Sequence, residues 1–121
     1  MRKEILRILY VEDDLRLRRR VVEEQLHDAE VTEVGTVLAA RLILEHASPF
    51  PFQVVLLDYS LPDGTGLEVL EAVRHHGAPV QVIGVSSCRE YNDLLRQAGA
   101  DQVIQKRSLH RLRPLLGLPD A

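Results

Sequence analysis

Apolar positions fall into short unbroken runs that alternate with longer segments in which they recur at helical spacing. Each run is aliphatic and brief, which is typical of a parallel strand buried on both faces. The second run along the chain gives the weakest signal. The pattern predicts strands over residues 7–11, 31–34, 54–57, 80–85 and 102–105.

The segments between the runs predict helices. In the first of them Leu15, Val22 and Leu26 recur near helical spacing, with charged residues between them. Asp14 precedes this segment and Thr36 precedes the next, and both residue types are suited to an N-cap. The predicted helices cover residues 15–26, 37–47, 67–75, 90–98 and 108–116, the last of them interrupted or ended by Pro114.

Strands alternate with helices along the whole chain, and no internal repeat is present. This order predicts an α/β fold: a doubly wound, five-stranded parallel sheet with helices on both faces. The 121 residues suffice for a single domain with its own core. We expect one domain over residues 1–121, with its core at about 4–116 and a tail or the start of a linker at 117–121.

Polar residues follow the apolar runs at the points where the strands are expected to end. The first run leads into Glu12, Asp13 and Asp14. The corresponding residues after the later runs are Asp58, Ser86 with Ser87, and Lys106. Because the carboxyl ends of neighbouring parallel strands meet at one edge of the sheet, these side chains should gather where ligands bind in such folds. Carboxylates, a hydroxyl and an ammonium together suit a divalent metal ion and a phosphoryl group.

Composition narrows the class of protein. The net charge is -3 and the pI about 5.9, whereas a nucleic-acid-binding domain is normally basic, so we expect no direct binding of nucleic acid. The single cysteine excludes an internal disulfide and fits a reducing compartment. The N-terminal run is too short and charged for a signal peptide, and no apolar stretch approaches the ~20 residues of a membrane span. We expect a cytoplasmic protein without a membrane segment.

The polar residues at the strand ends, in this order, resemble the receiver domain of two-component response regulators, the CheY-like superfamily. That family carries an acidic pair after strand 1, an aspartate followed by x-x-[ML]-P after strand 3, Ser or Thr after strand 4 and lysine after strand 5. The residues that carry the resemblance are Glu12-Asp13, Asp58 with Tyr59-Ser60-Leu61-Pro62, Ser86, Lys106, Gly66-Leu67-Glu68 and Gly99-Ala100-Asp101.

The resemblance implies a signalling switch rather than an enzyme with an external substrate. Asp58 is the implied phosphorylation site, taking a phosphoryl group from a sensor histidine kinase or a histidine phosphotransfer protein. Mg²⁺ (or Mn²⁺), which prefers oxygen ligands, is the implied cofactor; its implied ligands are Asp13, Asp58, the Ser60 carbonyl and, through water, Glu12. Lys106, Ser86 and Ser87 are the implied phosphate-binding and switch residues. The family also implies the strand order 2-1-3-4-5 and a homodimer through helix 4, strand 5 and helix 5.

Three features depart from the family. Arg107 follows the lysine where proline is usual, and Val103 stands where many members carry Tyr or Phe. The segment between Ser86 and Gly99 is shorter than usual. These departures concern the conformational response, whereas the residues for chemistry at Asp58 are all present.

Several alternatives remain open at this stage. A pseudo-receiver would keep the fold and act by protein contact without phosphorylation; Val103 and Arg107 are the residues that favour it. A hydrolase with an aspartyl-phosphate intermediate, of the haloacid dehalogenase type, would need a second acid two residues after the nucleophile, where this chain has Ser60. Arg18-Arg19-Arg20 is interpreted as a solvent-facing helix surface or a docking surface, and Cys88 as an inert small residue.

Overall fold

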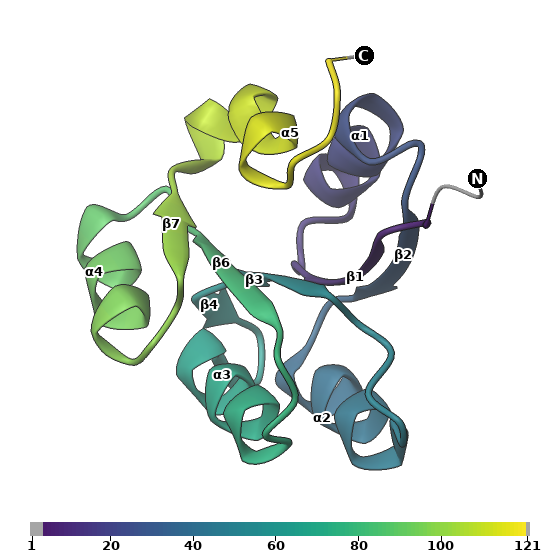
Figure 1. The fold of residues 1–121 in the computed structure, drawn as a ribbon. Coiled ribbons are helices and arrows are strands. Elements are labelled where there is room, and N and C mark those ends of the chain that lie inside the picture. Colours follow the sequence, from purple (N-terminus) through teal and green to yellow (C-terminus); the bar gives the residue numbers. More distant parts are fainter. Residues whose placement is uncertain (1–3, 121) are drawn as a thin grey trace.

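A five-stranded parallel sheet forms the centre of the computed structural model, which describes residues 4–120 (Figure 1). The strands lie in the order β2-β1-β3-β6-β7. They are β1 (Arg7–Val11), β2 (Glu30–Val34), β3 (Val54–Asp58), β6 (Gln81–Val85) and β7 (Gln102–Ile104). This is the predicted order 2-1-3-4-5 with two short strands intervening in the numbering. The predicted domain limits at residues 1–3 and 121 lie outside the described residues.

The two additional strands were not predicted. β4 (Ser60–Leu61) and β5 (Gly64–Thr65) pair antiparallel in a small ribbon directly after β3. The sequence there has turn residues, Pro62 and Gly64 among them, and strands of two residues leave no periodicity to recognise. The ribbon matters for the site because it follows Asp58 immediately.

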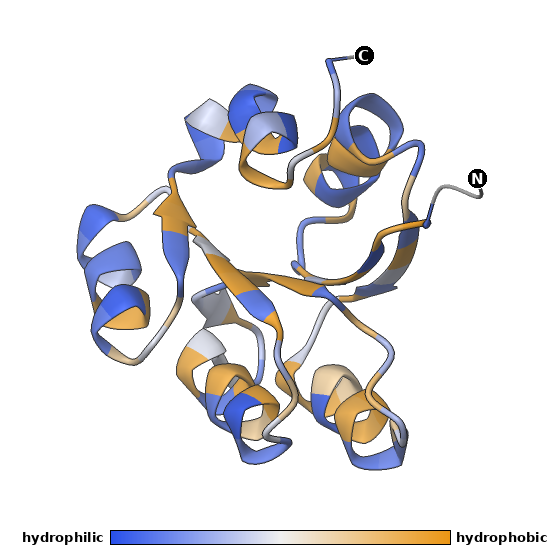
Figure 2. Ribbon diagram, viewed as in Figure 1, coloured by the Kyte–Doolittle hydropathy of each residue, from blue (hydrophilic) through white to orange (hydrophobic). Residues whose placement is uncertain are grey.

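The central strands are apolar because both faces of the sheet are covered. All five residues of β3 are buried, as are four of the five in β1 and in β6. The edge strand β2 is only partly buried and carries charged residues, which explains its weaker signal in the sequence. Figure 2 shows the resulting band of hydrophobic residues along the middle of the sheet.

Helices cover both faces of the sheet (Figure 1). One face carries α1 (Leu15–Gln25), the 3-10 helix η1 (Lys106–Arg111) and α5 (Leu112–Leu115). The other carries α2 (Val37–His46), α3 (Gly66–His75) and α4 (Arg89–Gln97). The predicted caps are confirmed, since Asp14 accepts a hydrogen bond from the Leu17 amide and Thr36 accepts one from the Ala39 amide.

Each face of the sheet has its own hydrophobic core. Leu9, Leu57 and Val82 point toward α2, α3 and α4, whereas Tyr10 and Leu56 point toward α1 and α5. The alternation along each strand therefore assigns Glu12 and Asp58 to the same face as Tyr10. No helix within residues 4–120 combines the length and the apolar character that crossing a membrane requires.

Two expectations about the helices need correction. Leu15, taken as part of the apolar stripe of its helix, is 58% exposed, and Val21 is the buried residue of α1. The tail is not one helix over residues 108–116: η1 begins at Lys106 and only four residues of α helix follow. The buried Arg113 anchors this tail, because its guanidinium donates hydrogen bonds to Asp28 and to the Gln25 and Pro119 carbonyls.

Candidate functional site

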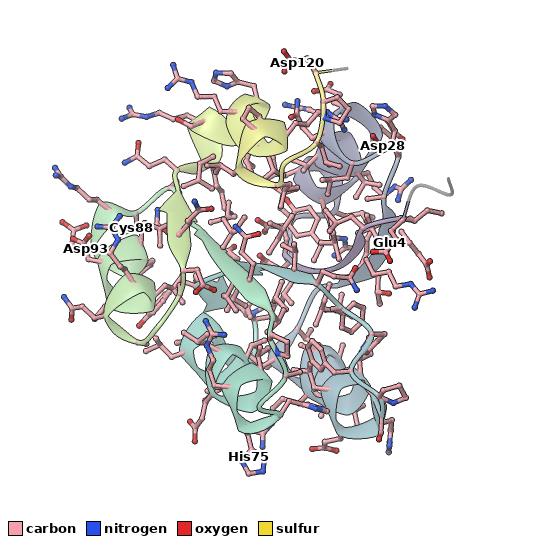
Figure 3. The ribbon with its side chains drawn as sticks, in the orientation of Figure 1. Glu4, Asp28, His75, Cys88, Asp93 and Asp120 are labelled. Carbon is pink, nitrogen blue, oxygen red and sulfur yellow. The ribbon has the colours of Figure 1, made fainter. Side chains whose placement is uncertain are left out.

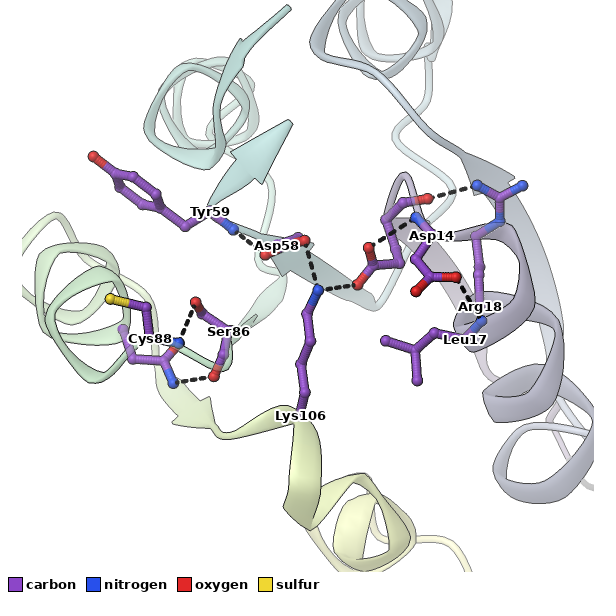
Figure 4. A network of polar contacts seen from close by, with 10 residues as sticks. Asp14, Leu17, Arg18, Asp58, Tyr59, Ser86, Cys88 and Lys106 are labelled. Atoms are coloured by element: carbon purple, nitrogen blue, oxygen red, sulfur yellow. Dashed lines mark hydrogen bonds and ion pairs between the residues drawn. The ribbon is translucent and has the colours of Figure 1, made fainter. Parts of the chain in front are cut away.

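The predicted strand-end residues meet at the carboxyl edge of the sheet (Figure 4). Glu12 follows β1, Asp58 ends β3, and Lys106 follows β7. The Lys106 Nζ lies 3.0 Å from Glu12 Oε1 and 3.0 Å from Asp58 Oδ2. The lysine therefore bridges two buried carboxylates that come from different strands.

The Asp58 carboxylate is held at both oxygens. Oδ2 accepts a hydrogen bond from Lys106, and Oδ1 accepts one from the Tyr59 amide at 2.7 Å. The start of α3 passes directly behind this residue: a Cβ on Gly66 would lie 2.3 Å from the Asp58 carbonyl oxygen. Only glycine allows so close an approach. The shape of this corner thus depends on Gly66, and the Asp58 side chain lines the cleft.

Glu12 is fully buried, and its surroundings are unusual for a carboxylate. Burial raises its pKa to about 7, with the nearby Asp58 contributing in the same direction, while the Asp14 amide and Lys106 act against this. Arg18 donates a hydrogen bond to the Glu12 carbonyl oxygen at 2.6 Å and another to Glu33 on β2. Glu12 is therefore positioned by its backbone as well as by its carboxylate.

Lys106 is the resident cation of the site. Burial alone would lower its pKa, but the hydrogen bonds to Glu12 and Asp58 outweigh burial, and the pKa of the ammonium is raised. The lysine is therefore charged at neutral pH. Its flexible stem allows the ammonium to move from a carboxylate to another nearby anion.

Asp13 completes an acidic group at this edge. One carboxylate oxygen from each of Glu12, Asp13 and Asp58 can be chosen so that all lie within 4.8 Å of one another. Glu12 and Asp58 are buried, whereas Asp13 is exposed. Hard oxygen ligands of this number suit Mg²⁺, which keeps several waters and takes one or two carboxylates. Ser60, the fourth predicted ligand, is exposed and lines the same cleft.

Ser86 lies opposite Asp58 across this cleft. It is 3% exposed, and its Oγ accepts a hydrogen bond from the Cys88 amide at 3.0 Å, which leaves the hydroxyl hydrogen free to donate. Ser87 is exposed beside it. The cleft has a volume of about 310 Å³ and is lined by Asp13, Asp14, Asp58, Ser60, Ser86, Ser87, Cys88, Tyr91 and Lys106.

Some residues at the site were not predicted to contribute. The Tyr59 and Tyr91 rings stack with their centroids 4.2 Å apart, joining the residue after Asp58 to α4. Arg18, expected on a solvent-facing surface, is instead largely buried against Glu33 and the Glu12 carbonyl. No pattern in the sequence indicated this role, because Glu33 lies on another element and only the fold brings it to Arg18.

The chain belongs to the response regulator receiver domain family of two-component systems, whose family model matches residues 8–115. The solved structure of a LuxR-family DNA-binding response regulator from Staphylococcus aureus superposes with a TM-score of 0.79 at 27% identity, covering 93% of this chain and 97% of that one. The fold and the order of the site residues agree with this membership.

Curated relatives include both short and long proteins. A two-component response regulator of Oryza sativa subsp. japonica is 29% identical, over 92% of this chain and 84% of the relative. Protein-glutamate methylesterase/protein-glutamine glutaminase 5 of Myxococcus xanthus is 35% identical over 84% of this chain. This chain spans 30% of that relative and 23% of a second methylesterase, from Nocardioides. The similarity to the methylesterases thus covers a minor part of their length.

Proposed function

We propose that this receiver domain accepts a phosphoryl group on Asp58 from a phosphohistidine donor and changes conformation in response. The observation that carries the proposal is the Lys106 bridge between the Asp58 and Glu12 carboxylates at the mouth of a cleft. A buried aspartate that is fixed at both oxygens is oriented for attack on phosphorus. The ammonium of the flexible Lys106 side chain beside it can then bind an oxygen of the phosphorylated aspartate.

In the proposed transfer an Asp58 carboxylate oxygen forms a bond to phosphorus while the bond from phosphorus to the donor imidazole nitrogen breaks. The imidazole leaves and takes up a proton. Lys106 then binds a phosphoryl oxygen in place of a carboxylate, and Ser86 donates its free hydroxyl hydrogen to another. Later attack by water on phosphorus releases inorganic phosphate and restores the Asp58 carboxylate.

Asp13, Asp58 and the Ser60 carbonyl would hold Mg²⁺ directly, with Glu12 contributing through water. When bound, the ion neutralises the charge that otherwise keeps a phosphoryl group away from three carboxylates. Glu12 must be ionised for this role, and the Arg18 contact holds its backbone in place. The chain's own contribution is thus to hold the acids, the lysine and the serine around one small cleft.

The same site suggests the class of phosphoryl donor and the elements that respond to phosphorylation. A sensor histidine kinase or a histidine phosphotransfer protein would present the phosphorylated imidazole at this open cleft. A dimer through α4, β7 and α5 would have to form with an α5 of only four residues. We therefore place the conformational response in α4 and the loop before it rather than in α5.

Incubation with acetyl phosphate and Mg²⁺, followed by intact-mass measurement, tests the proposal. We expect wild-type protein to gain the mass of one phosphoryl group, only with Mg²⁺ present, and Asp58→Asn to gain none. Asp14→Asn is the matched control, since Asp14 lines the same cleft but caps α1. A folded wild-type protein that gains no phosphoryl group from acetyl phosphate or from phosphohistidine proteins would favour the pseudo-receiver.

A further inference from the structure

The helix α4 approaches the phosphoryl site through one buried polar side chain. Asn92 is 4% exposed, although its neighbours in the sequence, Tyr91 and Asp93, are both exposed. Its Nδ2 donates hydrogen bonds to the Ser86 carbonyl at 3.2 Å and to the Ile104 carbonyl at 3.1 Å. One side chain on α4 thus contacts the ends of both β6 and β7.

The two contacts determine how the Asn92 amide is oriented. Both partners are carbonyl oxygens, which only accept hydrogen bonds, so the nitrogen of the amide must face them. The other amide atom, Oδ1, is buried and has no hydrogen-bond partner among residues 4–120. A buried acceptor without a partner costs stability. An apolar side chain would avoid that cost. What the amide provides at this position is therefore the pair of hydrogen bonds to the two carbonyls.

Asn92 binds the main chain at Ser86 and at Ile104, close to two of the site's side chains, Ser86 and Lys106. Ser86 carries the hydroxyl that faces the cleft, and its amide also donates to the Ile104 carbonyl at 3.3 Å. Ile104 ends β7, two residues before Lys106. The Ile104 carbonyl therefore accepts hydrogen bonds from both the Ser86 amide and the Asn92 side chain. A movement of one of these three residues disturbs the other two.

The packing of α4 on the sheet is close at this same place. Leu95, one helical turn after Asn92, is buried over Gly84, and a Cβ on Gly84 would lie 2.8 Å from the Leu95 Cδ1. Val103 pairs with Gly84 across the sheet and would contact that Cβ at 3.1 Å. The absence of a side chain at Gly84 thus lets Leu95 of α4 pack directly on β6. The Tyr59–Tyr91 stack adds a contact on the Asp58 side.

We propose that Asn92 is a positioning residue of the phosphoryl site, which fixes Ser86 and the strand end before Lys106 to α4. The proposal rests on the proposed function and names the element that answers phosphorylation. When Ser86 turns toward a phosphoryl oxygen, its Oγ leaves the Cys88 amide and its carbonyl pulls on Asn92. The displacement is then passed to α4 without any aromatic side chain on β7.

Amide hydrogen exchange, followed by NMR in the unphosphorylated protein, tests the attachment itself. Asn92→Leu replaces the amide with an apolar side chain of similar size. Asp93→Asn is the control because Asp93 points outward from α4 (Figure 3). We expect exchange at the Ser86 and Cys88 amides to accelerate about tenfold in Asn92→Leu, the effect of losing one hydrogen bond. Exchange in β1 and β3 should stay at wild-type rates, as should all rates in Asp93→Asn.

Unchanged exchange at Ser86 and Cys88 would overturn the proposal. Uniform acceleration over the whole sheet would also overturn it, because Asn92 would then serve only global stability. Asn92→Asp, which keeps the shape, covers the case in which the leucine variant does not fold. Its carboxylate cannot donate to the two carbonyls, so the loop amides should lose protection at neutral pH and regain it at low pH, where the protonated acid donates again.

Phosphorylation kinetics provide the second measurement. The hydrogen bonds of Asn92 go to the Ser86 and Ile104 carbonyls and to none of the predicted metal ligands, so Mg²⁺ affinity should be the same in Asn92→Leu and in wild type. The rate of phosphorylation by acetyl phosphate should fall about tenfold, because the phosphate-binding Ser86 and Lys106 are no longer held in place. A wild-type rate in the variant would contradict the positioning role. If wild-type protein takes up no phosphoryl group, the proposed function fails and the exchange measurement alone decides on Asn92.

Discussion

Replacing Lys106 with methionine removes the cation that bridges the two buried carboxylates, Glu12 and Asp58. Methionine keeps much of the length and the apolar stem of lysine, so the change isolates the charge. Glu12 is fully buried and Asp58 is 4% exposed, and each lies 3.0 Å from the ammonium. We expect Lys106→Met to destabilise the folded protein in the absence of metal.

The size of the expected loss in the free energy of unfolding follows from the burial of the three charged side chains. Removing one partner of a fully buried ion pair costs about 3–5 kcal/mol because a charge is left uncompensated. The Lys106 side chain is 25% exposed, so solvent screens part of the interaction. We therefore expect a loss of about 2–3 kcal/mol in the free energy of unfolding at pH 8, above the pKa of about 7 of Glu12.

The loss of stability in Lys106→Met should become smaller as the pH falls. The pKa of Glu12, already about 7, rises further without the lysine, so Glu12 takes up a proton as the pH falls. A neutral Glu12 no longer needs a counter-ion, and the difference between variant and wild type should shrink toward pH 5. Mg²⁺ should stabilise the variant more than the wild type, since a ligand that binds only the folded state adds stability and the variant lacks the competing ammonium.

Urea unfolding at pH 8 and pH 5, with and without Mg²⁺, measures all three effects. Arg107→Met is the matched control, because Arg107 is an exposed cation at the next position and should change stability by less than about 0.5 kcal/mol. Equal stability of Lys106→Met and wild type at pH 8 would refute the reasoning. So would a loss that is the same at both pH values, because the carboxylates would then not be its cause.

Three further predictions concern other residues. Below pH 7 the Mg²⁺ affinity should fall about tenfold per pH unit, because Glu12 with its raised pKa must lose a proton first; calorimetry on Glu12→Gln should show a weaker pH dependence, and equal dependence would exclude Glu12. Gly84→Ala should lower the free energy of unfolding by about 1–3 kcal/mol, since its Cβ would collide with Leu95; an unchanged urea midpoint would contradict the close packing of α4. In Arg113→Met the pKa of Asp28, held low by hydrogen bonds from Arg113, should rise toward its ordinary value in an NMR titration; an unmoved pKa would exclude the guanidinium as the cause.

The sequence predicted the five strands well because both faces of the sheet are buried. Burial on both faces requires uninterrupted apolar runs, and these end where the strands end. The short ribbon after Asp58 escaped prediction because its strands have two residues each. The tail was misread as one α helix, since a 3-10 helix has nearly the same apolar spacing over six residues.

The meeting of Glu12, Asp58 and Lys106 was also predictable. In a parallel sheet the carboxyl ends of the strands share one edge, so residues that follow the strands must be neighbours. The bridge that Lys106 makes between two carboxylates was not predictable, because it depends on the conformation of a long side chain. The sequence predicted that the lysine lies at the site, but it did not predict which side chains the ammonium contacts.

Asn92 shows what pattern reading misses on a helix. A polar residue within a charged helix is normally interpreted as facing solvent, and Asn92 follows Tyr91 and precedes Asp93. Its spacing of three residues from Leu95 puts it on the buried stripe. That spacing was the available signal, but the partners of the amide lie at the ends of two neighbouring strands, β6 and β7, and only the fold brings them together.

The most direct test of the central claim is to locate the phosphoryl group. After incubation with acetyl phosphate and Mg²⁺, borohydride reduction converts a phosphorylated aspartate to homoserine, and peptide mass spectrometry identifies its position. We predict homoserine at position 58 and at no other aspartate of the cleft. Homoserine at Asp13 or Asp14, or a stable phosphoryl group on a residue outside the cleft, would contradict the account.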